Sequence, residues 1–167
     1  ALAALYLRLN GYFTTGLIVH STEHGQATTE VDCVAIRMPN HRQTDRIVGD
    51  APFLAITPGL TDLIICEVKS DPTKVAFNNP LKTSQQAIEA ILEWAGVHAD
   101  ANIANVAEKF QPLLADQASV DQIVAGIVKD GVRVRALLCC PTSAPTDGAR
   151  WLLDGAEILR YAEECFN

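Results

Sequence analysis

The chain has 167 residues, the length of one domain, and 49% of them are hydrophobic, which is enough to bury a core. No apolar stretch reaches the ~18 residues that a membrane span requires, so we expect no membrane partner. The net charge of −7 excludes a protein that coats nucleic acid nonspecifically, but a local basic strip on an acidic body is compatible with a nuclease.

The first part of the chain is predicted as a helix followed by two strands. Apolar residues recur at helical spacing over 1–10, and Gly11 follows as a helix stop. Because this pattern is already under way at the first residue, we expect the protein to continue upstream. Alternating patterns predict strands over 15–21 and 28–38, with a turn over 22–26 between them.

A long polar connection, residues 39–61, leads to the predicted central strand. The connection contains Pro52 and Pro58 around a short apolar stretch, 53–56. Residues 62–69 are then almost continuously apolar, as in a strand that is covered on both faces.

The second half of the chain is predicted to be mainly helical. Residues 82–96 form an amphipathic helix, with Thr83 or Ser84 as its cap and Gly96 at its end. The remaining elements are helices over 101–114 and 120–129, strands over 132–140 and 149–153, and a helix over 156–166. This order predicts an α/β fold, a single domain over 1–167 with a central mixed β-sheet flanked by α-helices on both faces.

The five cysteines are an odd number, and most of them lie inside apolar runs. This pattern favours reduced core thiols and a cytoplasmic protein. The neighbours Cys139 and Cys140 can be read as a redox pair, but packing in a buried strand is the favoured interpretation.

Glu67 and Lys69 are the most informative residues of the chain. They stand two positions apart at the end of the central strand, so their side chains share one face. Asp32, on the strand over 28–38, supplies a second carboxylate, with Glu30 two residues before it. Two carboxylates can hold a hard cation through oxygen, and the lysine can offset charge that develops as a phosphodiester breaks. The competing interpretation is a buried ion pair between strands, which would contribute little net stability and leaves the second carboxylate unexplained.

The residues around this constellation resemble the PD-(D/E)xK nuclease superfamily, which has the restriction-endonuclease-like fold. The matching segments are 6–12 (YLRLNGY), 29–35 (TEVDCVA) and 65–70 (ICEVKS). The resemblance covers residues 1 to about 95 and fits the later strand and helix more loosely. It implies a magnesium-dependent nuclease of that fold.

The resemblance also implies a role for individual residues. Asp32 and Glu67 take the places of the metal ligands for Mg²⁺, with Mn²⁺ as a substitute, and Lys69 that of the catalytic lysine. The carbonyl of Val68 is implied as a further metal ligand. Glu30 is either an outer metal ligand or an exposed residue at the start of a strand. Gln85 and Gln86 resemble a glutamine that several branches carry on the next helix, and a solvated first turn is the alternative.

A basic cluster in the long connection is the candidate for nucleic-acid binding. His41, Arg42 and Arg46 gather there, either to contact phosphates beside the site or as a solvated loop. The partner we expect is DNA. A homodimer is left open, because many such enzymes pair to cut both strands.

The sequence therefore predicts a metal-dependent endonuclease that hydrolyses DNA in repair, recombination or restriction. The first alternative is a catalytically inactive restriction-endonuclease-like domain that acts as a nucleic-acid-binding or structural subunit. The acidic composition and the lack of an acidic residue in the first helix favour it, whereas the intact set of Asp32, Glu67 and Lys69 argues against it. The second alternative, action on RNA or a nucleotide, has no 2′-hydroxyl-reading feature behind it.

Overall fold

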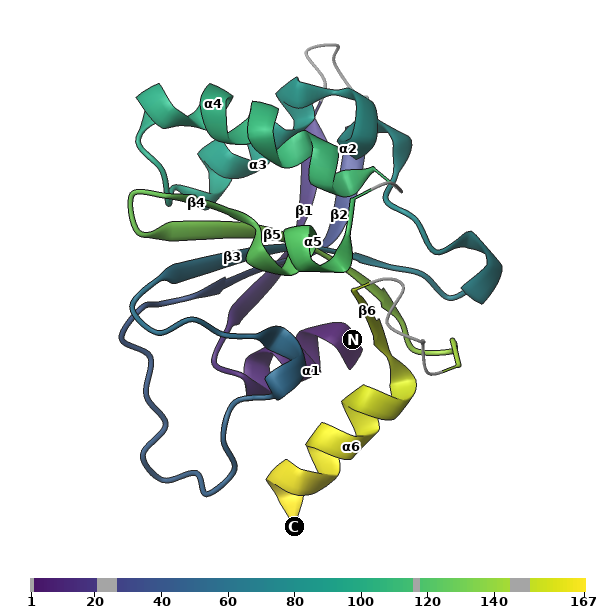
Figure 1. The fold of residues 1–167 in the computed structure, drawn as a ribbon. Coiled ribbons are helices and arrows are strands. Elements are labelled where there is room, and N and C mark those ends of the chain that lie inside the picture. The colour runs from purple at the N-terminus through teal and green to yellow at the C-terminus, as the bar shows by residue number, and fades with distance from the viewer. Residues whose placement is uncertain (1, 21–26, 116–117, 145–150) are drawn as a thin grey trace.

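A six-stranded mixed β-sheet lies between two layers of helices (Figure 1). The structure is a computed structural model, and it describes residues 2–20, 27–115, 118–144 and 151–167. The prediction of a mixed sheet flanked by helices on both faces is confirmed. Within those ranges no helix is long and apolar enough to cross a membrane.

The sheet places β3 at its centre. The strands are β1 (Phe13–His20), β2 (Ala27–Arg37), β3 (Thr61–Val68), β4 (Ile127–Lys129), β5 (Val132–Cys140) and β6 (Leu152–Asp154). Their order is β1-β2-β3-β5-β4, and β6 also pairs with β5. The pairs β3–β5 and β5–β6 are parallel, and the others are antiparallel. The parallel β3–β5 pair requires a crossover, which the helices between these strands provide.

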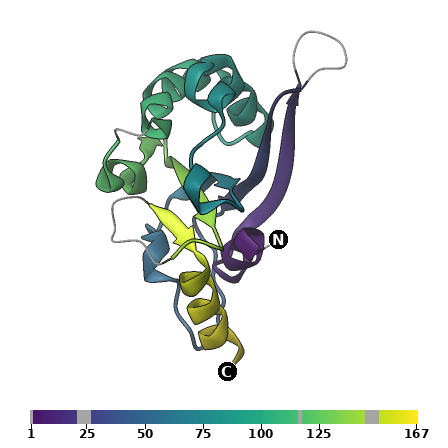
Figure 2. The ribbon, with the colours of Figure 1, turned by 90° about the vertical axis from the view of Figure 1, so that its right-hand side faces the viewer.

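The helices divide between the two faces of the sheet. They are α1 (Leu2–Leu9), α2 (Asn79–Thr83), α3 (Gln85–Ala95), α4 (Asp100–Phe110), α5 (Val120–Ala125) and α6 (Gly155–Phe166), with short 3₁₀ turns η1 (Pro52–Leu54), η2 (Pro72–Lys74) and η3 (Gln111–Leu114). Helices α2, α3 and α4 cover one face, and α1 and α6 cover the other (Figure 1). The β1–β2 hairpin curves along one edge of the molecule (Figure 2).

Alternate residues of β3 build two separate cores. Leu63 and Ile65 pack in a first core with α2, α3 and α4, whereas Ile64 and Cys66 pack in a second core with α1, η1 and α6. All four side chains are fully or almost fully buried. Because burying each large aliphatic side chain contributes about 1.5–3 kcal/mol, β3 is held firmly and its last residues have a fixed support.

The predicted helix over 82–96 is two helices. Lys82 and Thr83 end α2, and Ser84 then caps α3 by accepting a hydrogen bond from the backbone N–H of Ala87 at 3.3 Å. Ser84 as a cap and Gly96 as the end of the helix, in the left-handed conformation, are confirmed. The break places a short helix beside the end of β3.

The predicted helix over 120–129 is wrong in its last third. Helix α5 ends at Ala125, and Ile127–Lys129 form β4, which pairs with β5. A Cβ on Gly126 would lie 2.4 Å from the carbonyl oxygen of Val134, so only glycine lets the chain approach β5 this closely. Asp130 and Gly131 both have positive φ, the geometry of a tight two-residue hairpin turn.

The remaining expectations agree with the structure in part. Strand β6 covers 152–154, whereas the first two residues of the predicted strand 149–153 lie outside the described ranges, as does the predicted turn over 22–26. All five cysteines are free thiols, and four of them are buried. Burial raises the pKa of the Cys66 thiol, which suits a packing role.

Candidate active site at the end of β3

Asp32 lies at an irregularity in the β1–β2 ladder. Thr15 pairs with Val34 and Leu17 pairs with Val31, so two steps along β1 match three along β2. The extra residue places Val31 and Val34 in the same core, although they are three positions apart and would otherwise point to opposite faces. Such a bulge re-aims the side chains within it, and Asp32 is one of them.

The carboxylate of Asp32 is anchored to the end of β3. Its Oδ2 accepts a hydrogen bond from the backbone N–H of Val68 at 2.7 Å. The β2–β3 register, in which Cys33 pairs with Cys66, leads directly to this contact. The residue is exposed, and within the described residues its other oxygen accepts no hydrogen bond. Asp32 is thus fixed beside Glu67 with one oxygen available to a ligand.

Glu67 is a buried carboxylate with one oxygen unsatisfied. The residue is 2% exposed, its Oε1 accepts from Lys69 Nζ at 2.6 Å, and its Oε2 is buried without a hydrogen-bond partner in the described part of the chain. Burial raises the pKa of Glu67, and the charges of Asp32 and Glu30 add to this, so the single contact with Lys69 does not compensate. A buried polar atom without a partner costs about 1–3 kcal/mol, which a ligand at that oxygen would recover.

Lys69 is held from two sides. Besides the contact with Glu67, its Nζ donates to Asn78 Oδ1 at 2.9 Å, and Asn78 directly precedes α2. The backbone N–H of Lys69 donates to the carbonyl of Cys139 at 2.8 Å, which ties the end of β3 to β5. The ammonium group is therefore fixed, although the side chain keeps 23% of its surface exposed.

An open hollow of about 520 Å³ adjoins Lys69. Its walls come from β2, η2 and α2 and comprise Thr29, Glu30, Lys69, Lys74, Ala76, Phe77, Asn78, Asn79, Pro80 and Lys82. Three of these residues are lysines, and Glu30 is the single carboxylate among them. Lys69 therefore borders a recess whose walls are mainly polar and carry more basic than acidic side chains, on a chain whose net charge is −7, whereas Asp32 and Glu67 do not line it.

The predicted site residues fall into two groups. Asp32, Glu67, Val68 and Lys69 meet at the end of β3, and Glu30 is near enough for its charge to raise the pKa of Glu67. The glutamines are engaged elsewhere or open to solvent. The amide of Gln85 donates to Glu89 Oε1 at 2.7 Å and points to α4, where it donates to the carbonyl of Ala104 at 3.4 Å, and Gln86 is exposed.

The basic loop that carries His41, Arg42 and Arg46 lies at the opposite end of β3. It joins the end of β2 to the start of β3, and Figure 1 shows it on the other side of the molecule from η2. The two ends of β3 (Thr61–Val68) are about 24 Å apart, at ~3.4 Å per residue. Arg46 is bonded to the backbone of Val48 and Leu9, the ring of His41 packs against Gly11, and Arg42 is exposed.

Asn78 was not among the predicted site residues. The sequence does carry a signal for it: Asn78 and Asn79 before Pro80 are typical of a helix start. That signal predicts a helix from 79 onward, but it does not predict that the turn preceding it folds back onto Lys69.

The donor set fits a hard divalent cation better than a soft one. Asp32 and Glu67 offer carboxylate oxygens, and Val68 adds a backbone carbonyl. Within the described ranges no group of three or more His, Cys, Asp or Glu side chains converges on one point. Mg²⁺ commonly uses only one or two carboxylates and completes its shell with water and substrate phosphates, so two carboxylates are sufficient. The unsatisfied Oε2 of Glu67 is the observation that favours a cation here.

Comparisons with known proteins add no relative: no family model, no curated protein and no solved structure matches this chain.

Proposed function

We propose that the protein is a magnesium-dependent phosphodiesterase that hydrolyses DNA internally, with a restriction-endonuclease-like fold. The observation that carries this proposal is the state of Glu67, which is buried beside a lysine and a second carboxylate and has a raised pKa, and whose Oε2 has no partner among the described residues. Groups with such perturbed pKa values at the edge of a hollow are candidates for chemistry.

Asp32 and Glu67, with the carbonyl of Val68, would hold Mg²⁺, and Mn²⁺ would substitute for it. When bound, the cation would supply a Lewis acid for the phosphate and a source of activated water. The residues of the chain would do the rest. Lys69 would direct its ammonium at the phosphate oxygens and stabilise the negative charge that grows in the transition state. The anchored Asp32 and the rigid β3 would keep these groups in place during the reaction.

Three further observations support this proposal. The Asp32, Glu67 and Lys69 side chains come from neighbouring antiparallel strands, as the resemblance to the PD-(D/E)xK nuclease superfamily requires. Helix α1 precedes the β1–β2 hairpin and packs under the sheet. The hollow beside Lys69 presents lysines to an anionic ligand. Action on DNA in repair, recombination or restriction, and a cytoplasmic location, stay predictions.

A second candidate is an inactive domain of the same fold that binds nucleic acid. Helix α1 (LAALYLRL) has no carboxylate, and the chain is acidic. Such a domain would bind DNA and leave it intact. The preserved carboxylates and Lys69 favour the enzyme, because a binding module has no use for a buried acid with an open oxygen.

The test is a cleavage assay on supercoiled, linear, single-stranded and branched DNA with Mg²⁺, Mn²⁺ or a chelator. We expect metal-dependent cleavage by the wild type and none by Asp32→Ala. Titration of Mn²⁺ by calorimetry should show binding to the wild type and a much weaker signal for Asp32→Ala. Intact DNA under every condition, with normal DNA binding, would support the inactive domain instead.

A further inference from the structure

We propose that the hollow beside Lys69 is the binding site for the phosphate backbone of the substrate strand, with Lys82 and Lys74 as its phosphate contacts. This inference rests on the proposed function and adds the surface that holds the polyanion. It places the strand on the side of the sheet that carries α2. The basic loop at the start of β3 is left out of the contact.

The distribution of free positive charge supports this surface. Most basic residues in the described ranges are ion-paired with an acid: Arg37, Arg46, Lys69, Lys74, Lys129, Arg133, Arg135 and Arg160. Arg8, Arg42, Lys82 and Lys109 have no such pair within those ranges. Of these four, Lys82 lines the hollow together with Lys69. An uncompensated cation beside the candidate site is the group that a phosphate would meet first.

The position of Lys82 suits a phosphate contact. The residue is half-buried, and its carbonyl accepts a hydrogen bond from Gln111 Nε2 at 3.2 Å, which fixes the backbone that carries it. Lys74 stands across the hollow with 81% of its side chain exposed, and its pair with Asp71 is long, at 3.6 Å. Such an exposed pair contributes little, so a phosphate can take over Lys74 at small cost. The amide of Asn79 adds a neutral donor to the same wall.

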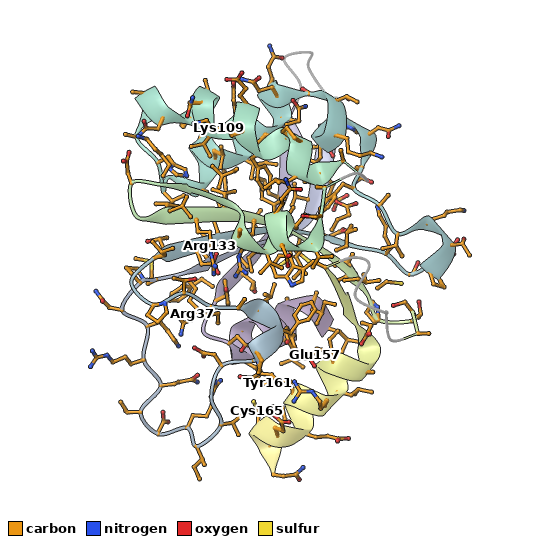
Figure 3. The ribbon with its side chains drawn as sticks, viewed as in Figure 1. Arg37, Lys109, Arg133, Glu157, Tyr161 and Cys165 are labelled. Carbon is orange, nitrogen blue, oxygen red and sulfur yellow. The ribbon has the colours of Figure 1, made fainter. Side chains whose placement is uncertain are left out.

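The experiment measures binding of a short fluorescent DNA duplex to the metal-free protein over a range of salt concentrations. The slope of log K against log[salt] is negative, and each phosphate contact that is lost should reduce its magnitude by about 0.9. Lys74→Ala/Lys82→Ala should therefore reduce the magnitude by about two. The matched control is Lys109→Ala, which removes a free lysine from α4, in the helical layer shown in Figure 3. We expect the control to keep the wild-type slope.

The outcomes separate this inference from the proposed function. A slope that falls in Lys74→Ala/Lys82→Ala alone supports the binding site, even if no metal produces cleavage. Metal-dependent cleavage with an unchanged slope in that variant would overturn the binding site and leave the nuclease standing. The binding site would also be overturned if Lys109→Ala reduced the magnitude of the slope as much as each lysine of the double variant does. Binding would then depend on the net charge of the protein and not on this surface.

A different observation, the hydrogen bond between Lys69 and Asn78, carries a second inference. We infer that Asn78 is a positioning residue, which keeps the Lys69 ammonium group directed at the hollow when Glu67 binds a cation. Its Oδ1 accepts from Nζ at 2.9 Å, and its side chain makes no capping hydrogen bond to α2. The side chain is therefore available to Lys69 and is not required to start the helix.

The test compares Asn78→Ala with Asn78→Asp, which keeps an acceptor oxygen, and with Asn105→Ala, at an exposed position of α4, as the control. In metal-free protein, acetic anhydride should label Lys69 several-fold faster in Asn78→Ala, as read by mass spectrometry, and no faster than in the wild type in the other two. In the nuclease assay, kcat should fall about tenfold or more in Asn78→Ala, with KM little changed. Unchanged labelling of Lys69, or a rise in KM at constant kcat, would overturn this role.

Discussion

Asp62 and Glu67 are buried carboxylates at the two ends of β3, and each is 2% exposed. Each also lies beside basic side chains in the fold: Asp62 beside Arg133 and Arg135 of β5, and Glu67 beside Lys69. At Asp62 both oxygens are saturated. Tyr12 donates to Oδ2 at 2.6 Å, and the guanidinium groups of Arg133 and Arg135 donate to both oxygens. Figure 3 shows Arg133 between the sheet and the loop that precedes β3.

The pKa values of the two carboxyl groups move in opposite directions. Burial raises the pKa of Asp62, but Arg135, Arg133 and Tyr12 outweigh it and hold the pKa below its ordinary value. At Glu67 burial prevails over Lys69, and the pKa is raised. The fold thus stabilises the charged form of Asp62 and destabilises the charged form of Glu67.

The comparison shows how a structural ion pair can be distinguished from a candidate catalytic one. Burial and an adjacent base are common to both ends. What differs is whether every oxygen has a donor, since a fully paired carboxylate has no capacity left for a ligand. The guanidinium of Arg133 also donates to the carbonyl of Ala55 and that of Arg135 to the carbonyl of Leu54, so the Asp62 cluster fastens η1 to the sheet. Its role is to hold the loop.

The largest effect should come from a substitution of Asp62, at the end of β3 where the ion pairs are structural. Asp62→Ala leaves Arg133 and Arg135 buried without their counter-charge, and removing one partner of a buried pair costs about 3–5 kcal/mol. We expect the free energy of unfolding to fall by that amount in urea titrations. Asp62→Asn, which keeps the shape of the side chain without its charge, should lower the free energy of unfolding by a similar amount. A change below about 0.5 kcal/mol in both variants would contradict the assignment.

The next largest effect should come from a substitution of Lys69, at the Glu67 end of β3, and it should appear in the cleavage rate. Lys69→Ala removes the ammonium group that is proposed to act in the transition state, so kcat should fall by about two to three orders of magnitude. Mn²⁺ binding should change little, whereas the unfolding midpoint should fall, because the buried Glu67 loses the hydrogen bond to its Oε1. Lys129→Ala, which removes a lysine from β4, is the control and should be fully active. Retained cleavage in Lys69→Ala would assign the chemistry to other residues.

A smaller effect concerns stability and pH. The raised pKa of Glu67 means that the folded protein binds more protons than the unfolded chain between the ordinary glutamic acid value and the raised one, so Glu67 makes stability decline as pH rises through that window. Glu67→Gln removes the titration and the repulsion from Asp32. We expect this variant to be more stable than the wild type by about 1 kcal/mol above the window and nearly equal below it.

Urea unfolding of both proteins across the acidic and neutral range checks this sign. The matched comparison is Asp62, whose lowered pKa contributes stability above its ordinary value that is lost as pH falls. The same Glu67→Gln protein should bind Mn²⁺ far more weakly. A variant that is less stable than the wild type at neutral pH would mean that Glu67 is a structural acid after all.

The sequence predicted β1, β2, β3, β5 and β6, and the position of the motif, because their signals are local, whereas β4 was predicted as helix. The apolar run over 62–69 and the alternation over 28–38 place Asp32, Glu67 and Lys69 without knowledge of the rest of the chain. The hairpin turn at Asp130 and Gly131 was also readable, since this dipeptide is the strongest short signal for a two-residue turn.

Other features depend on contacts between distant residues. The bulge at Asp32 exists only relative to the pairing of β2 with β1, so the sequence of β2 alone does not reveal it. The contact of Asn78 with Lys69 requires the turn through η2, and the saturation of Asp62 requires Tyr12 and Arg135 to meet across the sheet. Whether a carboxylate is satisfied is a property of the assembled fold, so the sequence shows neither the saturation of Asp62 nor the open oxygen of Glu67.

The smallest expected effect concerns Arg42 in the basic loop at the Asp62 end of β3, and Arg46 in the same loop is the contrast. Arg46 donates to the carbonyl of Val48 at 2.7 Å and to that of Leu9, and its guanidinium lies 5.8 Å from the centre of the Tyr161 ring. These contacts hold the loop to α1 and α6, so Arg46→Ala should lower the free energy of unfolding by about 2 kcal/mol. Arg42 is exposed and makes no such bond within the part of the chain that the structure describes. Arg42→Ala should therefore leave stability unchanged and lower the salt slope of DNA binding by less than one unit. A fall of a full unit in Arg42→Ala would show that the strand extends from the hollow to this loop, and that the structural end of β3 also contacts the substrate.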